Sequence, residues 1–393
     1  MSHSVSPEPA APLNKTQLES ETVRVNSNPD PTDDAVSEVD QDAAAIGSTP
    51  VTDTTAVAVD DALERRIRLK VDLRLCGIAS SRRMVLEPDG IAAAGALEAL
   101  AWSPTPMDLD ALIAHVATRR PTQPVLVDCT ASDALAAAYP RLLAAGFHVV
   151  TASKRANSGP LELYREIRAA RSRFRRHFRY ETNVGAGLPV IDTLRNLLAG
   201  GDRVIRFEGI LSGSLSFLFG LLEEGVPFSQ AVRTACERGF TEPDPRDDLS
   251  GLDVARKVLI LHREAGGTLE PDAVEVTGVL PAGFDASGGV PAFLSRLPAL
   301  DEPFAERVRH LATRGEALRF VGTLDEAGCR VGLREVGPDH PLRHIRGGEN
   351  AFSFLTEHYQ PRPLVVQGYG AGAAVTAAGV LADILKIVQQ VNL

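Results

Sequence analysis

Residues 241–257 hold the densest group of charged side chains in this 393-residue chain. Residues 242–248 contain four carboxylates and two prolines, and because proline fixes φ we expect a stiff, solvent-facing loop here. Asp253 and Lys257 follow four residues apart, which places a carboxylate beside an ammonium group on one helical face. A lysine held in this way can donate a proton to a carbonyl oxygen, and clustered carboxylates can attract a substrate ammonium group. A surface ion pair next to a polar turn is the alternative, and the spacing alone does not separate the two.

Two glycine-rich segments could bring the backbone close to a ligand. Gly185 and Gly187 precede Pro189 and a predicted helix, and residues 368–372 precede another helix. Glycine permits positive φ, and a helix N-terminus offers free N–H groups to an anion. Tight turns alone would also explain each segment, so neither is specific by itself.

The elements before residue 190 alternate between strands and helices. Apolar runs at residues 73–79, 125–129 and 147–150 predict strands, and helical patterns occupy residues 109–118 and 134–145. Such alternation predicts right-handed βαβ units, a parallel sheet and a doubly wound α/β domain.

The pattern changes after about residue 190, where strands and helices no longer alternate regularly. Grouped strands of this kind predict an α+β second domain with antiparallel or mixed pairing. The predicted helices are residues 191–198, 215–224, 229–238 and 254–264, and the predicted strands are residues 204–211, 318–323, 330–335 and 363–367.

Residues 1–61 differ from the rest in composition. They contain twelve carboxylates, two basic residues and no aromatic residue, so this stretch carries the whole net charge of -10 and the other 332 residues are neutral overall. We expect a disordered acidic tail, because it has too little apolar surface to offset chain entropy; it either has no specific partner or mediates an interaction.

The composition also limits which kinds of partner the protein can bind and indicates its cellular compartment. No domain carries the basic excess that phosphate contacts need, which argues against a nucleic-acid binder and favours small molecules. The four cysteines lack CxxC spacing, so neither a disulfide framework nor a zinc site is expected. We expect a cytoplasmic protein without membrane association, because no apolar run approaches a span and the N-terminus lacks signal-peptide order.

Taken together, the segments at residues 127–130, 209–216, 241–257 and 368–372 resemble homoserine dehydrogenase, in particular the dehydrogenase half of the bifunctional aspartokinase/homoserine dehydrogenases. The resemblance runs from about Val71 to the C-terminus, and no aspartokinase half is present. It implies NAD(P)-dependent interconversion of L-aspartate 4-semialdehyde and L-homoserine in threonine and methionine biosynthesis. It also implies a Rossmann-type nucleotide-binding domain, a catalytic and dimerisation domain, and a homodimer.

The resemblance implies a role for individual residues, by position. Lys257 matches the proton donor, Asp253 its substrate-side carboxylate, and Lys154 a lysine between cofactor and substrate. The substrate contacts are Glu242, which holds the substrate ammonium, together with Asp248 and Ser214. The cofactor contacts are Thr130, Lys154 and Gly370, and a monovalent-cation site for sodium or potassium is built from Glu181, Val184, Ala186 and Leu188, largely through backbone carbonyls.

The phosphate-binding start of a Rossmann domain is missing from the sequence. Such a domain should open with a strand, a GxGxxG turn and a helix, but the only glycine upstream of Val71 is Gly47, and the strand-like residues 56–59 lead to Asp60 and Asp61. Two carboxylates would repel a pyrophosphate. We therefore expect an incomplete nucleotide-binding domain in which the first strand and its loop have been replaced by the acidic tail.

Arg82 and Arg83 follow the surviving second strand, where an acidic residue would bind a ribose hydroxyl. Arginines there favour a 2'-phosphate, so we expect NADP(H), with NAD(H) as the alternative; a plain surface basic pair fits equally well. Three functions remain open: a homoserine dehydrogenase, a catalytically impaired paralogue that binds substrate or dimerises, and a scaffolding protein. The expected organisation is a tail at residues 1–61, a nucleotide-binding domain at 62–190, a catalytic and dimerisation domain at 191–364, and a C-terminal segment at 365–393 that returns to the nucleotide-binding domain.

Overall fold

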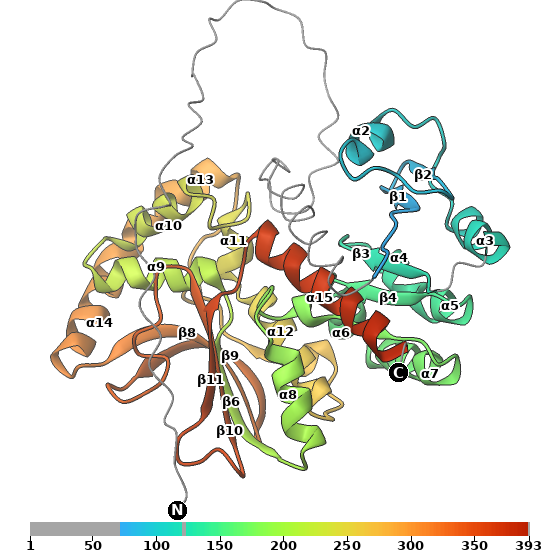
Figure 1. The fold of residues 1–393 in the computed structure, drawn as a ribbon. Coiled ribbons are helices and arrows are strands. Elements are labelled where there is room, and N and C mark those ends of the chain that lie inside the picture. Colours follow the sequence, from blue (N-terminus) through green and yellow to red (C-terminus); the bar gives the residue numbers. More distant parts are fainter. Residues whose placement is uncertain (1–70, 120–122, 392–393) are drawn as a thin grey trace, which may run out of the picture. The chain divides into compact units, whose positions relative to one another are not determined.

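The structure, a computed structural model, describes residues 71–119 and 123–391. The tail expected at residues 1–61 lies outside these described residues. Figure 1 shows the described part as two regions rich in regular structure, joined by the chain after β5 and again by the C-terminal helix.

A parallel three-stranded sheet forms the centre of the first region. Strands β3 (Val125–Asp128), β4 (His148–Thr151) and β5 (Phe178–Arg179) lie side by side in the order β3-β4-β5. Both pairs are parallel, as the alternation of strands and helices predicts. All four residues of β4 are buried, the polar His148 and Thr151 included, as expected for the central strand of a parallel sheet.

The remaining elements of this region cover the sheet or extend it. The strand predicted at residues 73–79 is shorter than expected, and among the described residues it pairs only with β2, in a separate antiparallel hairpin. The helix predicted at residues 134–145 is two helices, because Pro140 cannot donate its N–H to a continuing helix. The bounds are β1 (Gly77–Ala79), β2 (Met84–Leu86), α2 (Ala96–Ala101), α3 (Leu109–Arg119), α4 (Asp133–Ala137), α5 (Tyr139–Ala144), α6 (Arg155–Ser158) and α7 (Leu161–Arg173).

A six-stranded sheet forms the second region, in the order β11-β10-β6-β8-β9-β7. Its pairs are antiparallel except for β7 with β9, which confirms the α+β prediction. The helices α9, α12 and α14 pack on strands of this sheet, and their apolar faces form the core with Phe207, Phe320 and Phe352. The strands are β6 (Val204–Ile210), β7 (Glu275–Val276), β8 (Ala317–Asp325), β9 (Gly328–Val336), β10 (Glu349–Thr356) and β11 (Leu364–Tyr369). The helices are η2 (Glu181–Asn183), α8 (Val190–Ala199), α9 (Gly213–Glu223), α10 (Phe228–Glu237), α11 (Pro245–Leu249), α12 (Leu252–Glu264), η3 (Pro271–Ala273), α13 (Val290–Arg296), η4 (Leu297–Leu300) and α14 (Asp301–Thr313).

The last helix, α15 (Ala373–Val391), returns to the first region. It packs against β4 and η2, and the carboxylate of Asp383 accepts a hydrogen bond of 2.8 Å from the backbone N–H of Glu181. By length and composition alone this helix could cross a membrane, which differs from the sequence expectation that no run approaches a span. The helix carries the buried Asp383 and contacts β4 and η2, while 17% of its apolar 18-residue window is buried.

Candidate active site

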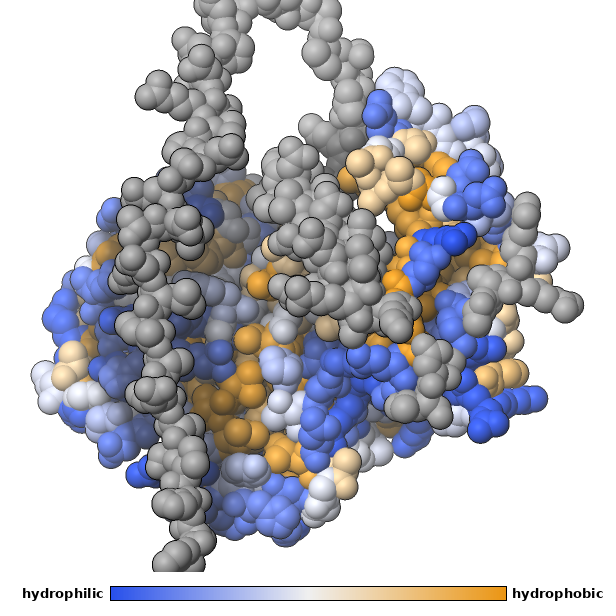
Figure 2. Space-filling model, in the orientation of Figure 1, coloured by the Kyte–Doolittle hydropathy of each residue, from blue (hydrophilic) through white to orange (hydrophobic). Residues whose placement is uncertain are grey.

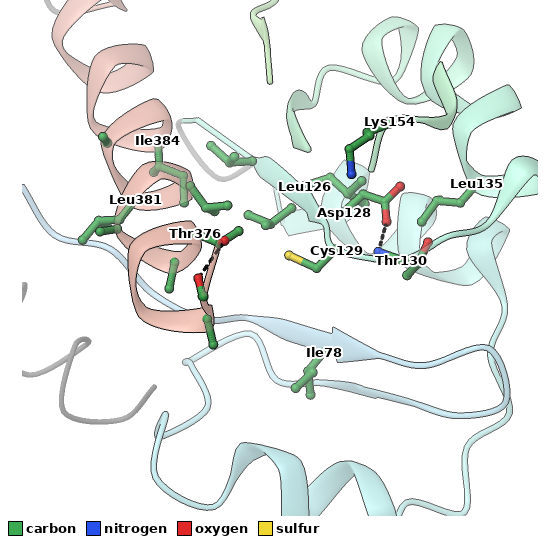
Figure 3. A pocket seen from close by; sticks show the side chains of 18 of the residues that line it. Ile78, Leu126, Asp128, Cys129, Thr130, Leu135, Lys154, Thr376, Leu381 and Ile384 are labelled. Carbon is green, nitrogen blue, oxygen red and sulfur yellow. Dashed lines mark hydrogen bonds between the residues drawn. The ribbon is translucent and has the colours of Figure 1, made fainter. Parts of the chain in front are cut away.

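A large cavity of about 3070 Å³ opens between the first region and the helices α11 and α12 of the second region. Its walls include Thr130 after β3, Lys154 after β4, and Asp253 on α12. Figure 3 shows Lys154 and Thr130 on one side of this space and α15 on the other. A ligand pocket commonly measures about 300–1,000 Å³, so the cavity has room for a dinucleotide and a small substrate together.

Two lysines converge on one carboxylate in this cavity. The Lys257 Nζ lies 2.7 Å from Asp253 Oδ2, one turn away on α12, and the Lys154 Nζ lies 3.2 Å from Asp253 Oδ1. Lys257 also donates to the carbonyl oxygen of Leu211 over 2.7 Å. With two of its three protons directed at protein oxygens, Lys257 keeps one proton for a ligand. The ion pair predicted from the spacing is thus formed, and Lys154 joins it from the other region.

The charges around Asp253 shift the pKa values of the group. Burial alone would raise the pKa of Asp253, but Lys257 and Lys154 outweigh burial and hold that pKa well below its usual range. Burial lowers the pKa of Lys257, and Asp253 only partly opposes this effect. A lysine whose pKa is lowered gives up its proton more readily, as a general acid must.

The acidic segment before α12 is partly helical, which corrects the prediction of a loop over residues 242–248. Asp244 caps helix α11 by accepting a hydrogen bond from the Arg246 N–H, and Pro245 occupies the first helical position. Proline is tolerated there because its missing N–H would have had no partner inside the helix. Arg246 also donates to the carbonyl oxygens of Ala286 and Gly288, both over 2.8 Å.

Ser214, Asp248 and Glu242 form a chain of hydrogen bonds. The Ser214 hydroxyl donates to Asp248 Oδ1 over 2.7 Å, and Asp248 Oδ2 accepts the backbone N–H of Glu242 over 2.8 Å. Both oxygens of Asp248 are therefore used to hold the segment, while the side chain of Glu242 is exposed at the cavity. Burial, followed by Asp248 and Asp253, raises the pKa of Glu242. A substrate ammonium group would relieve this crowding of negative charge.

The predicted cofactor contacts fall into two groups. Thr130 and Gly370 line the cavity, and a side chain at Gly370 would clash with the buried amide of Asn350, 2.1 Å from its new Cβ. Arg82 and Arg83 are not among the residues that line the cavity, and the guanidinium of Arg83 donates to the carbonyl oxygen of Ala101.

The turn predicted to hold a monovalent cation has an unusual backbone. Gly185 and Ala186 both have positive φ, 82° and 51°, and alanine rarely adopts this conformation. Such strain persists where the surrounding structure fixes it, and it is common at functional sites.

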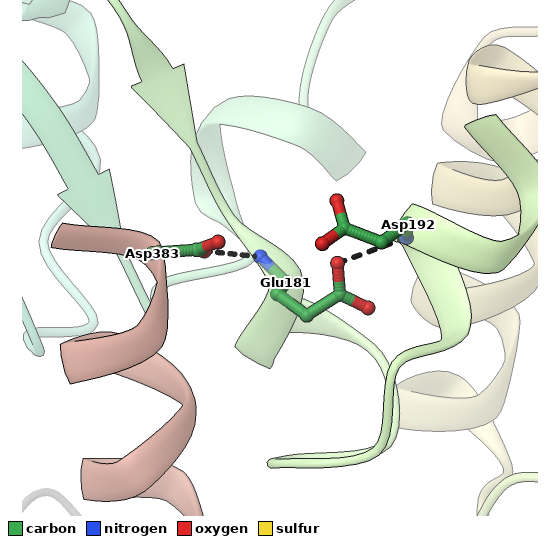
Figure 4. A group of neighbouring side chains, drawn as sticks. All are labelled: Glu181, Asp192 and Asp383. Atoms are coloured by element: carbon green, nitrogen blue, oxygen red, sulfur yellow. Dashed lines mark hydrogen bonds between the residues drawn. The ribbon is translucent and has the colours of Figure 1, made fainter. Parts of the chain in front are cut away.

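Three carboxylates meet beside this turn, and only one of them belongs to the predicted site. Oxygen atoms of Glu181, Asp192 and Asp383 lie within 4.8 Å of one another (Figure 4). Glu181 accepts the N–H groups of Ile191 and Asp192 at the start of α8. Burial and then Asp192 raise the pKa of Glu181 to about 7, and the Lys386 ammonium already pairs with Asp192 and lies 3.6 Å from Asp383. Asp192 lies on α8, and Asp383 lies on α15, 202 residues after Glu181. Their spacing in the sequence therefore gives no sign that they join Glu181.

Two family models match the chain. One described as homoserine dehydrogenase matches residues 189–385, and one described as homoserine dehydrogenase, NAD binding domain, matches residues 50–181.

Curated relatives agree with these matches. The bifunctional aspartokinase/homoserine dehydrogenase of Haemophilus influenzae is 50% identical over 319 residues, which is 81% of this chain and 39% of the relative. A homoserine dehydrogenase of Schizosaccharomyces pombe is 42% identical over 292 residues, 72% of this chain and 77% of the relative. The chain thus spans about two fifths of the length of the bifunctional relatives that it matches.

Solved structures share the fold. A protein of unknown function from Candida auris is 34% identical with a TM-score of 0.76, covering 84% of this chain and 96% of its own. A hyperthermophilic archaeal homoserine dehydrogenase in complex with NADPH has a TM-score of 0.64 at 24% identity, covering 86% of this chain and 94% of its own; at that identity the likeness concerns the fold alone.

Proposed function

The chain belongs to the homoserine dehydrogenase family, and from this premise we propose that it interconverts L-aspartate 4-semialdehyde and L-homoserine with a nicotinamide cofactor. The observation that carries the proposal is the convergence of Lys154 and Lys257 on Asp253 at the cavity. Two lysines and the nearby carboxylates suit a substrate that bears both a carboxylate and an ammonium group.

Lys257 is proposed to donate the proton that the reduced carbonyl oxygen needs. A bound nicotinamide would supply the hydride, so no protein nucleophile is required. The chain's own task is to position the aldehyde and to neutralise the developing alkoxide. Asp253 and the Leu211 carbonyl fix the Lys257 Nζ and leave one N–H for the substrate oxygen.

Glu242 is proposed to hold the substrate ammonium. Its backbone is tied to Asp248, whose other oxygen is tied to Ser214, so the carboxylate is supported by a rigid chain. Asp248 and Ser214 then act mainly as positioning residues. This differs from the direct substrate contacts that the family resemblance implies.

NADP(H) is the proposed cofactor, with Thr130, Lys154 and Gly370 at its binding surface. These residues line one cavity, and Gly370 has no side chain there because the amide of Asn350 occupies the space of a Cβ. A preference for the 2'-phosphate through Arg82 and Arg83 would require Arg83 to leave the Ala101 carbonyl.

A sodium or potassium ion is proposed at the turn of Glu181, Val184, Ala186 and Leu188. Carbonyl oxygens suit a hard monovalent cation, and the strained φ of Ala186 together with the adjacent carboxylates supports a site there. Replacing sodium and potassium by a bulky organic cation should lower the melting temperature if such an ion is bound.

We further propose a cytoplasmic homodimer that acts on small molecules. All four cysteines are free thiols, which fits a reducing compartment. Light scattering after size exclusion tests the dimer, since it gives the mass of the assembly directly.

A catalytically impaired paralogue is the second candidate, favoured because the sequence has no GxGxxG pattern before Val71, where Gly47 is the only glycine. Product analysis separates the two functions. The full chain, incubated with aspartate semialdehyde and NADPH, should form homoserine that amino-acid chromatography detects. Substrate binding without product would favour the paralogue.

A further inference from the structure

Arg263, near the C-terminal end of α12, carries a charge that is buried inside the protein. Charged side chains are ordinarily solvated at the surface, and many hydrophilic residues cover the face of the molecule in Figure 2. The side chain of Arg263 is instead 0% exposed. Its guanidinium donates to the carbonyl oxygens of Asn157 and Gly159 over 2.9 and 2.8 Å, and also to that of Leu269. A buried charge is costly unless hydrogen bonds satisfy it, so Arg263 depends on these carbonyl groups.

The segment that Arg263 binds is α6, the short helix directly after Lys154. Helices α6 and α12 pack against each other (Figure 1). Because α6 has only four residues, it is not stable by itself in water. Its last carbonyl groups also have no partner within the helix, and Arg263 supplies a donor for that of Asn157. The stability of α6 therefore depends on its contacts with α12.

Lys154 is tied to α6 through its own backbone. Its carbonyl oxygen accepts the N–H groups of Asn157 and Ser158 over 3.0 and 2.9 Å, and the Ser158 hydroxyl over 2.9 Å. The buried side-chain amide of Asn157 donates to that of Asn183, which donates to the carbonyl oxygen of Thr151 at the end of β4, both over 2.9 Å. The backbone that carries Lys154 is thus fixed between β4 and α6.

Glu270, in the chain that follows α12, holds the other end of the same segment. Its Oε2 accepts the backbone N–H of Leu161, the first residue of α7, over 2.9 Å, and lies 3.6 Å from the Arg263 guanidinium. Arg263 and Glu270 together therefore form a clamp on residues 157–161, the link between α6 and α7. The side chain of Glu270 is 51% exposed, so its replacement should disturb the fold less than that of Arg263.

We propose that Arg263, supported by Glu270, is a positioning residue that holds Lys154 at its distance from Asp253. Helix α12 carries Asp253 and Lys257 in its first half and Arg263 near its end, about 15 Å further along the axis than Asp253. One helix therefore presents two members of the proposed catalytic group and clamps the segment that carries the third. The proposal rests on the proposed function and extends it to residues outside the active site, since neither Arg263 nor Glu270 lines the cavity.

The position of Lys154 should affect the ionisation of Lys257. Burial is the main cause that lowers the pKa of Lys257, and repulsion by the ammonium group of Lys154 lowers it further. If Lys154 moves away, the pKa of Lys257 should rise, and homoserine oxidation, which needs the neutral amine, should require a higher pH. A residue that only stabilises the fold would lower the melting temperature without moving this pH profile.

Hydrogen–deuterium exchange on the full chain without ligands tests the clamp itself. Arg263→Lys keeps the charge but loses the forked donor geometry, and the amides of residues 157–159 should then exchange about 10-fold faster or more. Arg319→Lys is the matched control, because Arg319 is also buried and also donates to backbone carbonyl oxygens, but in the second region alone. It should leave exchange at residues 157–159 unchanged. Unchanged exchange in Arg263→Lys, or equal acceleration in both variants, would overturn the proposal.

Kinetic measurements test whether the clamp acts through Lys154. Arg263→Lys should lower kcat by about 10- to 100-fold, because a displacement of about 1 Å in a catalytic group can cost this much, and it should move the oxidation profile to higher pH. In a Lys154→Ala background, Arg263→Lys should cause little further loss of kcat, since the two changes affect the same group. Losses that multiply in full, or a pH profile that does not move, would overturn the proposal.

Glu270→Ala provides a second variant in case Arg263→Lys does not fold. It removes the outer half of the clamp, and it should accelerate exchange at residues 157–161 and move the pH profile in the same direction by a smaller amount. If neither changes, the proposal is overturned. Because the exchange measurement needs no turnover, its failure is distinct from a failure of the proposed function.

Discussion

The two sheets of this protein differ in how completely the described residues build them. In the catalytic region β8 lies between β6 and β9, and eight of its nine residues are buried. In the nucleotide-binding region β3 has one neighbour and one buried residue of four. The proposed proton donor Lys257 and its partner Asp253 therefore lie on α12, which packs on the complete sheet, while the proposed cofactor site lies beside the sheet with the open edge. Chemistry and cofactor affinity should consequently respond to different changes.

Removal of the proton donor should have the largest effect. Lys257→Ala is expected to lower kcat by roughly 10²–10⁴, the range for loss of a positioned general acid. Steady-state rates of aspartate semialdehyde reduction measure this. Arg309→Ala, on the exposed surface of α14, is the matched control and should retain the wild-type rate. Full activity of the Lys257 variant would show that Lys154 or water donates the proton instead.

The affinity for NADPH should be low, because the cofactor would bind beside the sheet with the open edge. A turn without the usual glycines loses backbone hydrogen bonds to the pyrophosphate, and two charge-assisted bonds correspond to roughly 10²–10⁴ in affinity. We expect calorimetric titration to show NADPH binding that is weak or undetectable at micromolar concentration. Low-micromolar binding would mean that residues before β1 rebuild a full phosphate site, and the contrast between the two sheets would then not extend to affinity.

Loss of the proposed contact between Glu242 and the substrate ammonium should weaken substrate binding more than it slows the chemical step. Glu242→Gln is expected to raise KM for homoserine by about 10- to 100-fold, since one charge-assisted hydrogen bond is lost, with a smaller change in kcat. Glu302→Gln, a charge removal at an exposed position on α14, should leave KM unchanged. An equal loss in kcat would instead place Glu242 in the chemical step.

The pH profile should show the smallest but most specific effect. Burial lowers the pKa of Lys257, so homoserine oxidation, which needs the neutral amine as base, should rise with pH through a pKa below that of free lysine. Aspartate semialdehyde reduction, which needs the ammonium, should fall over the same range. Asp253→Asn removes the charge that raises this pKa and should move both profiles to lower pH. If the profiles do not move, the observed pH dependence does not come from the ionisation of Lys257.

The sequence predicts the Asp253–Lys257 ion pair correctly because the information for it is local. Asp253 and Lys257 share a helical turn, and the apolar spacing of α12 is enough to bring them together. The expectation of a loop over residues 242–248 is wrong for α11, because Pro245 stands at the first helical position, where proline is accepted.

Contacts between distant segments could not be predicted in this way. The carboxylate cluster of Glu181, Asp192 and Asp383 joins η2, α8 and α15, and only the tertiary fold brings it together. The same holds for Arg83, which follows the strand as predicted but bonds to Ala101 eighteen residues later.

The most direct test of the account is kcat for aspartate semialdehyde reduction by the full chain, extrapolated to saturating NADPH. The intact group of Asp253, Lys257 and Lys154 predicts steady turnover once millimolar NADPH compensates for weak binding. No turnover above that of Lys257→Ala at saturating NADPH would contradict the account, because the catalytic region would then be inactive even with its cofactor present.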